Sequence, residues 1–146
     1  MGTRSAIGIK YGDKIKAVYC HYDGYLSYVG RTLITYYQDS VKVSKLISMG
    51  DMSGIGADIG EKHNFNDRSE YLDNGIATEC TFYNRDRGES NVDYRTFSSE
   101  QDFLDNFNAG EEYFYLYDRG TWYYSTGGVF NKLSPKLVED ILKDAA

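Results

Sequence analysis

The four residues YGDK at positions 11–14 constrain the fold most, because they separate two strand-like runs at 4–10 and 15–22. Two β-rich runs joined by a short Gly-Asp turn are typical of a β-hairpin. With Gly12 and Asp13 as the turn, we expect the facing pairs Arg4 and His21, Ser5 and Cys20, Ala6 and Tyr19, Ile7 and Val18, Gly8 and Ala17, and Ile9 and Lys16. A hairpin at this position predicts a sheet that grows mainly by antiparallel pairing.

The rest of the chain repeats strand-like and helix-like patterns in an order that indicates an α+β fold. Further strands are expected at residues 76–83, 92–97, 112–117 and 121–126. Helices are expected after Ser27, after Asp39 or Ser40, after Ser98 or Ser99, and after Ser134. We therefore predict one α+β domain over residues 1–146, in the order ββαα-loop-ββαββα. It would have a mainly antiparallel sheet of about six strands, helices packed on one face and an irregular loop at 51–75.

The charge of the chain is negative and unevenly distributed. Residues 1–60 hold seven Lys and Arg against five Asp and Glu, whereas residues 61–146 hold nine against 17. Direct binding to nucleic acid requires a basic face, which the second half does not offer. An acidic surface with 15 tyrosines in the chain favours a basic protein as partner. The simpler interpretation is a solvated acidic surface that keeps the protein in solution.

Few residue patterns in the chain match known chemistry. The glycines between positions 54 and 60 have the wrong spacing for a phosphate-binding loop and follow an expected helix instead of a strand. Cys20 and His21 are adjacent on an expected strand, so their side chains point to opposite faces and cannot share a nucleophilic site unless the strand bulges. Neither Cys20 nor Cys80 has metal-ligand spacing. We expect no metal, no cofactor and, since no signal peptide or membrane-spanning run is evident, a cytoplasmic protein with free thiols.

One group of residues could form a small-ligand site. If the hairpin register holds, Arg4 and His21 are cross-strand neighbours, and Asp23 and Tyr25 follow where the strand ends. A guanidinium, an imidazole and a carboxylate together could bind an anion or perform acid–base chemistry. The structural alternative is that Asp23 pairs with Arg4 or caps the turn, while Gly24 adopts an unusual backbone angle.

A second group is the aromatic run of the second hairpin. Phe114 and Leu116 are expected to face the core, which would leave a partner-binding surface on the other face of the sheet. The expected members of this surface are Tyr113, Tyr115, Tyr117, Trp122 and Tyr124, flanked by Glu111 and Glu112. The structural alternative is that these rings pack beneath the helices.

The N-terminal motif MGTRS, followed by Tyr19-x-His21-x-Asp23-Gly24-Tyr25 and Gly30, resembles a group of small proteins encoded by tailed phages and prophages. The resemblance covers about the first 60 residues, including the pieces GD at 50–51 and SGIG at 53–56. It implies a viral context, and it assigns neither an activity nor site residues.

Three functions remain open from the sequence. The first is a phage-encoded accessory protein that binds a host protein in the host cytoplasm without catalysis, as an anti-CRISPR-like or other inhibitor of a host defence system. The second is a protein that binds or sequesters a nucleotide signal through Arg4, His21 and Asp23. The third is a small enzyme of unknown reaction. A homo-oligomer is compatible with each.

Overall fold

The structure, a computed structural model, describes residues 2–67 and 70–145 of the chain. Met1 of the N-terminal motif, and Arg68 and Ser69 of the segment expected to be irregular, lie outside the described residues. The strands are β1 (Ser5–Tyr11), β2 (Lys14–Cys20), β3 (Met52–Gly54), β4 (Thr81–Phe82), β5 (Arg95–Phe97), β6 (Tyr113–Asp118), β7 (Thr121–Ser125) and β8 (Asn131–Lys132). The helices are the π-helical turn η1 (Leu26–Gly30), α1 (Arg31–Tyr36), α2 (Ser40–Ser48), α3 (Tyr83–Arg87), α4 (Glu100–Asn106) and α5 (Pro135–Ala145).

The strands form one open sheet in the order β4-β3-β2-β1-β6-β7-β8, and β5 pairs with β2 outside this path. Five of the seven strand pairs are antiparallel, and the pairs β1–β6 and β2–β3 are parallel. The parallel pair β1–β6 joins the first hairpin to the second at the centre of the sheet. The predicted α+β class with a mainly antiparallel sheet is confirmed, with eight strands in the sheet.

The first hairpin has the predicted register. Ser5 faces Cys20, Ile7 faces Val18, and the other pairs from Ala6 to Ile9 also match. Because a slip of one residue would turn every side chain to the other face of the sheet, this register decides which residues enter which core.

Both faces of the sheet are covered. On one face Ile7 and Val18 pack beneath η1, α1, α2 and α5 in the larger core cluster. On the other face Ala17 and Phe114 pack against Phe103 of α4 in a second cluster. Helix α4 thus departs from the expected arrangement of helices on one face, because β1, β2 and β6 are apolar on both faces.

Three helix starts follow the predicted caps, whereas the cap predicted at Ser27 is wrong, because Ser27 lies within η1 and no side chain caps that helix. The side chains of Asp39, Ser99 and Ser134 accept hydrogen bonds from the backbone N–H groups of Val41, Asp102 and Leu137. Each cap satisfies a donor that the first helical turn cannot pair internally. No helix in the described part of the chain combines the length and apolar character required to cross a membrane.

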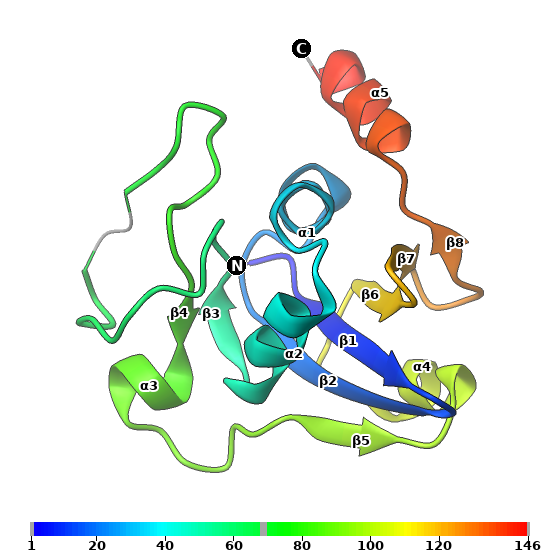
Figure 1. The fold of residues 1–146 in the computed structure, drawn as a ribbon, viewed down its shortest axis with the longest axis horizontal. Helices are drawn as coiled ribbons and strands as arrows, with labels where there is room; N and C mark the ends of the chain where they lie inside the picture. The colour runs from blue at the N-terminus through cyan, green and yellow to red at the C-terminus, as the bar shows by residue number, and fades with distance from the viewer. Residues whose placement is uncertain (1, 68–69, 146) are drawn as a thin grey trace.

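The segment between β3 and β4 differs most from its prediction. Figure 1 shows it as a long lobe beside the β3–β4 edge of the sheet. The strand expected at 76–83 is reduced to the two residues of β4, with single bridges from Asp58 to Glu79 and from Tyr71 to Ala77. Residues 83–87 form α3, and β3 lies within the region expected to be loop.

Candidate functional site

A buried ion pair in α3 organises the edge of the sheet next to β4. The carboxylate of Asp86, whose side chain has no exposed surface, lies 2.9 Å from Nε of Arg85. It also accepts hydrogen bonds from the backbone N–H groups of Phe82 at 2.8 Å and His63 at 3.1 Å. Burial alone would raise the pKa of Asp86, but the hydrogen bonds from Arg85 and the two N–H groups lower that pKa below its ordinary value. Asp86 is therefore held as a carboxylate.

Arg85 ties this ion pair to the lobe. Its guanidinium donates to the backbone carbonyls of Ile59 and Gly60, each at 2.9 Å, and to that of Cys80 at 3.0 Å. One planar guanidinium thus connects the segment at Ile59 and Gly60 with the segment at Cys80. Its forked N–H groups allow several such hydrogen bonds at once.

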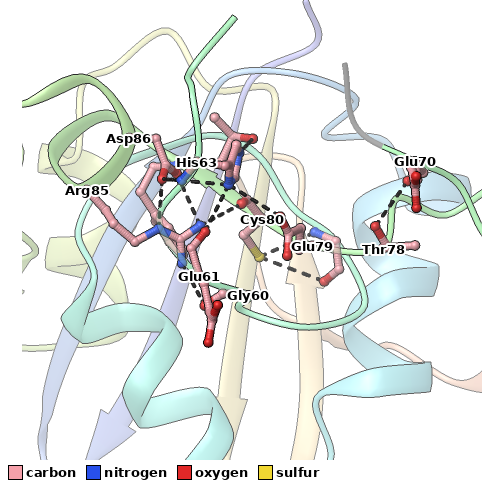
Figure 2. A network of polar contacts seen from close by, with 12 residues as sticks. Gly60, Glu61, His63, Glu70, Thr78, Glu79, Cys80, Arg85 and Asp86 are labelled. Atoms are coloured by element: carbon pink, nitrogen blue, oxygen red, sulfur yellow. Dashed lines mark hydrogen bonds and ion pairs between the residues drawn. The ribbon is translucent and has the colours of Figure 1, made fainter. Parts of the chain in front are cut away.

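His63 connects the ion pair to Glu79 (Figure 2). Its Nδ1 lies 2.9 Å from the carbonyl oxygen of Glu61 and 3.3 Å from Oε1 of Glu79, and its Nε2 lies 3.1 Å from the hydroxyl of Thr81. Because a carbonyl oxygen only accepts, Nδ1 donates to Glu61, and Nε2 is within hydrogen-bond distance of the Thr81 hydroxyl. His63 thereby fixes Glu79 and Thr81 relative to α3.

Residues 56–58 pack against residues 77–80 in a short ladder. The N–H of Ala57 donates to the carbonyl of Ala77 at 2.8 Å, and the N–H of Cys80 donates to that of Asp58 at 3.0 Å. A Cβ atom on Gly56 would overlap the backbone of Glu79. The glycine at position 56 therefore serves this close approach of two backbones.

These contacts form one wall of a pocket of about 220 Å³ between the end of β2 and the lobe. Three carboxylates line it, those of Asp23, Asp67 and Glu79. Four aromatic rings also line it, those of Tyr22, Tyr28, Phe65 and Tyr71. We call this cavity the acidic pocket. Its composition disfavours anions and favours a positively charged group.

Tyr28 is the most firmly held ring of the acidic pocket. Its hydroxyl donates to the carbonyl of Ile55 at 2.9 Å and accepts from the N–H of Ala77 at 3.1 Å. Burial raises the pKa of Tyr28 to about 12, so the phenol stays neutral at physiological pH. The ring joins η1 to both sides of the lobe.

Exposed apolar side chains surround the acidic pocket. Tyr71 is 67% exposed and Tyr22 is 48% exposed, and both line the pocket. Tyr25, also exposed, donates a hydrogen bond to Asp23 at 2.9 Å, and the exposed Leu72 follows Tyr71 in the chain. Of nine large apolar side chains that are exposed in the described part of the chain, four lie in this region. We call these four residues, Tyr22, Tyr25, Tyr71 and Leu72, the aromatic rim.

The two cysteines are unsuited to nucleophilic chemistry. Both Cys20 and Cys80 are fully buried free thiols. Burial raises the pKa of Cys20 to about 12 and that of Cys80 to about 11. Both therefore stay protonated near neutral pH and have no access to a substrate.

The residues of the predicted small-ligand site do not form one cluster, and the expected pair of Arg4 and His21 lies outside the β1–β2 register, which begins at Ser5 and Cys20. Burial and the nearby charge of Arg4 lower the pKa of His21, whose Nδ1 lies 2.6 Å from the hydroxyl of Tyr19. Asp23 instead accepts from Tyr25, and no hydrogen bond or ion pair within the described ranges joins Asp23 to Arg4 or His21. Asp23 lines the acidic pocket, which Arg4 and His21 do not reach.

Asp23 and Gly24 form the turn into η1, but the unusual backbone angle expected at Gly24 occurs at Asp23. Asp23, not Gly24, has the positive φ, 59°, and its carbonyl accepts from the N–H of Val29 at 3.2 Å. Gly24 is required for its small size, because a Cβ atom there would lie 2.8 Å from Cβ of Ser5. This turn presents the Asp23 side chain to the acidic pocket.

The predicted partner surface on β6 and β7 is wrong for three of its five rings. Tyr115, Tyr117 and Trp122 are buried in the larger core, because the helices cover this face of the sheet. Their polar atoms donate inward, at 2.6 to 2.8 Å, to the backbone carbonyls of Gly24, Gln38 and Tyr37 respectively. These three rings therefore pack beneath the helices, which was the alternative to a partner-binding surface.

The other members of that predicted surface do not restore it. Tyr113 and Tyr124 are half-buried beside the same core. Glu111 closes a local turn by accepting from the N–H of Ala109 at 2.8 Å, and Glu112 is exposed. The second hairpin thus offers no continuous aromatic face.

Sequence reasoning identified only Asp23 among the charged residues of the acidic pocket. Asp67 and Tyr71 lie in the segment expected to be irregular, and Glu79 lies in an expected strand. The one signal that could have found them is local charge, since residues 58–79 hold six Asp and Glu against two Lys and Arg. That signal marks the lobe as acidic without showing that it folds back on β2.

Comparison of the chain with protein-family models, with curated proteins and with solved structures finds no match.

Proposed function

We propose that the protein acts by binding, without turnover, to a basic protein through the acidic pocket and the aromatic rim. The observation that carries the proposal is the clustering of exposed apolar side chains around three carboxylates. An exposed apolar cluster is typical of an interaction surface, and tyrosine offers a large contact area together with a hydroxyl. Carboxylates within such a surface select a positively charged partner.

The resemblance of the N-terminal motif to proteins of tailed phages gives the proposal its biological setting. In this setting the partner is a host protein, and binding inhibits a host defence system, CRISPR-based or other. A defence protein that handles nucleic acid needs a basic surface, to which an acidic face is complementary.

The other two functions receive less support from the geometry. A nucleotide carries phosphates, which Asp23, Asp67 and Glu79 would repel from the acidic pocket. A cysteine-dependent enzyme needs an accessible thiolate, whereas burial raises the pKa of Cys20 and Cys80.

Affinity capture with matched variants tests the proposal. The wild-type protein and the double variant Tyr22→Ala/Tyr71→Ala are immobilised and exposed to a bacterial host lysate, with Tyr11→Ala/Tyr94→Ala as control because those two tyrosines are exposed elsewhere. We expect one basic protein to be retained by the wild type and by the control and lost from the double variant. Central interface tyrosines typically contribute at least about 2 kcal/mol, roughly 30-fold in Kd.

Two results would contradict the proposal. One is retention of the same partner by the wild type and the Tyr22→Ala/Tyr71→Ala variant with equal Kd. The other is a partner that is retained more strongly as the salt concentration rises, because attraction between opposite charges is screened by salt.

A further inference from the structure

The acidic pocket has the composition of a receptor for one organic cation. It combines three carboxylates with four aromatic side chains. Aromatic rings attract cations through their quadrupoles, and nearby carboxylates add a direct charge attraction. Its volume of about 220 Å³ lies below the roughly 300–1,000 Å³ of pockets for drug-sized ligands. A single side chain fits this size better than a nucleotide.

Asp23 and Asp67 are open to such a cation, whereas Glu79 already lies 3.3 Å from Nδ1 of His63. In residues 2–67 and 70–145, neither Asp23 nor Asp67 takes part in an ion pair. No three metal-ligating side chains in those ranges lie close enough to hold an ion. The arrangement therefore suits a large, delocalised cation better than a bare metal ion.

The inner wall of the acidic pocket is preorganised. Tyr28 is fixed by hydrogen bonds at 2.9 and 3.1 Å, and Glu79 is held 3.3 Å from Nδ1 of His63. The backbone N–H of His63 in turn donates to the carboxylate of Asp86 (Figure 2). A wall that is already ordered loses little conformational entropy on binding.

We infer that the acidic pocket accepts the side chain of an arginine from the basic partner. A guanidinium is planar, so it can stack on a tyrosine ring while its N–H groups donate to a carboxylate. A lysine ammonium is a compact, strongly hydrated charge that makes no such stacked, forked contact. The inference rests on the proposed function, of which it specifies the central contact.

Short peptides test this inference independently of the partner. The probes are acetyl-Gly-Arg-Gly-amide, the same peptide with citrulline, which has the shape of arginine without its charge, and the same peptide with lysine. Binding is followed by NMR through the backbone amide signals of the ¹⁵N-labelled protein. We expect saturable shifts at Tyr22, Asp23, Ser53 and Thr81 with the arginine peptide, and at least about tenfold weaker binding of the citrulline and lysine peptides.

Variants connect the shifts to the acidic pocket. Asp67→Asn and Tyr71→Ala should each weaken binding of the arginine peptide several-fold, whereas Asp13→Asn in the β1–β2 turn and Tyr94→Ala should leave it unchanged. The remaining amide signals of each variant report that the protein is folded. Equal affinity for the arginine and citrulline peptides, equal affinity for the lysine peptide, or shifts that cluster elsewhere would overturn the inference.

The two proposals fail in different ways. If the Tyr22→Ala/Tyr71→Ala variant loses the partner while the arginine and citrulline peptides bind equally, the arginine contact is wrong and the binding function stands. If the variant also keeps the partner with the wild-type Kd, both proposals are wrong.

Discussion

Two sets of tyrosines in this protein have opposite surroundings. Tyr115 and Tyr117 on β6 lie beneath the helices and donate to backbone carbonyls. Tyr22 and Tyr71 of the aromatic rim are exposed beside carboxylates. A run of tyrosines therefore does not identify an interaction surface by itself, because a helix that covers the rings makes them part of the core and uses their hydroxyls for structure.

The lobe that carries Tyr71 is held by the buried ion pair between Arg85 and Asp86. The substitution Asp86→Ala removes this ion pair. The substitution leaves Arg85 without its partner and two backbone N–H groups without an acceptor. We expect the free energy of unfolding to fall by about 3–5 kcal/mol, measured by urea denaturation. Asp93→Ala, at an exposed carboxylate, should change it by about 0.5 kcal/mol or less. Equal effects of the two substitutions would show that the ion pair does not hold the lobe.

Removing the hydroxyl of one tyrosine from each set should affect stability differently. Tyr115→Phe leaves the carbonyl of Gly24 without its donor in a buried site. We expect it to lower the free energy of unfolding by about 1–3 kcal/mol. Tyr71→Phe, at an exposed ring, should change it by about 0.5 kcal/mol or less. Thermal or urea denaturation of the two variants makes the measurement, and a similar loss in both would remove the distinction.

The pH dependence of stability reports on Asp86. The pKa of Asp86 in the folded protein is lowered from its usual 3.8. The stabilisation by this carboxylate is therefore fully present above the unfolded pKa and is lost as the pH falls through the folded pKa. We expect the free energy of unfolding of the wild type to fall more steeply below pH 3.8 than that of Asp86→Asn. Urea denaturation at a series of acidic pH values measures both slopes, and parallel slopes would contradict this role of Asp86.

Truncation of the rim should affect stability least. Tyr22→Ala/Tyr71→Ala removes two exposed rings, so we expect a change of about 1 kcal/mol or less in the free energy of unfolding. Binding to the partner should nevertheless be lost. A large loss of stability in this double variant would indicate that the rim belongs to the core, like Tyr115.

The fold could be predicted where contacts are local in sequence. The β1–β2 register follows from a two-residue turn at Gly12 and Asp13, and the caps at Ser99 and Ser134 need only the next three residues. The covering of the second face of the sheet was harder to predict from the sequence. Apolar alternation shows that two sets of side chains are buried, but it does not show that α4 covers one of them.

The acidic pocket could not be assembled from the sequence, because its three carboxylates lie far apart along the chain. Asp23 lies in the turn after β2, Asp67 lies in the lobe and Glu79 lies just before β4. They meet because Arg85 and Asp86 fold the lobe back through hydrogen bonds to backbone groups. Hydrogen bonds to backbone atoms leave no residue pattern that a single sequence reveals.

Nitration of tyrosines, with and without the captured partner, tests most directly the claim that the partner binds at the acidic pocket. In the free protein we expect tetranitromethane to modify Tyr22 and Tyr71 and to spare the buried Tyr115, as read by mass spectrometry of peptides. In the complex, Tyr22 and Tyr71 should be protected, while Tyr11 and Tyr94 react as before. Unchanged nitration of Tyr22 and Tyr71 in the complex, with protection of Tyr11 or Tyr94 instead, would contradict that claim.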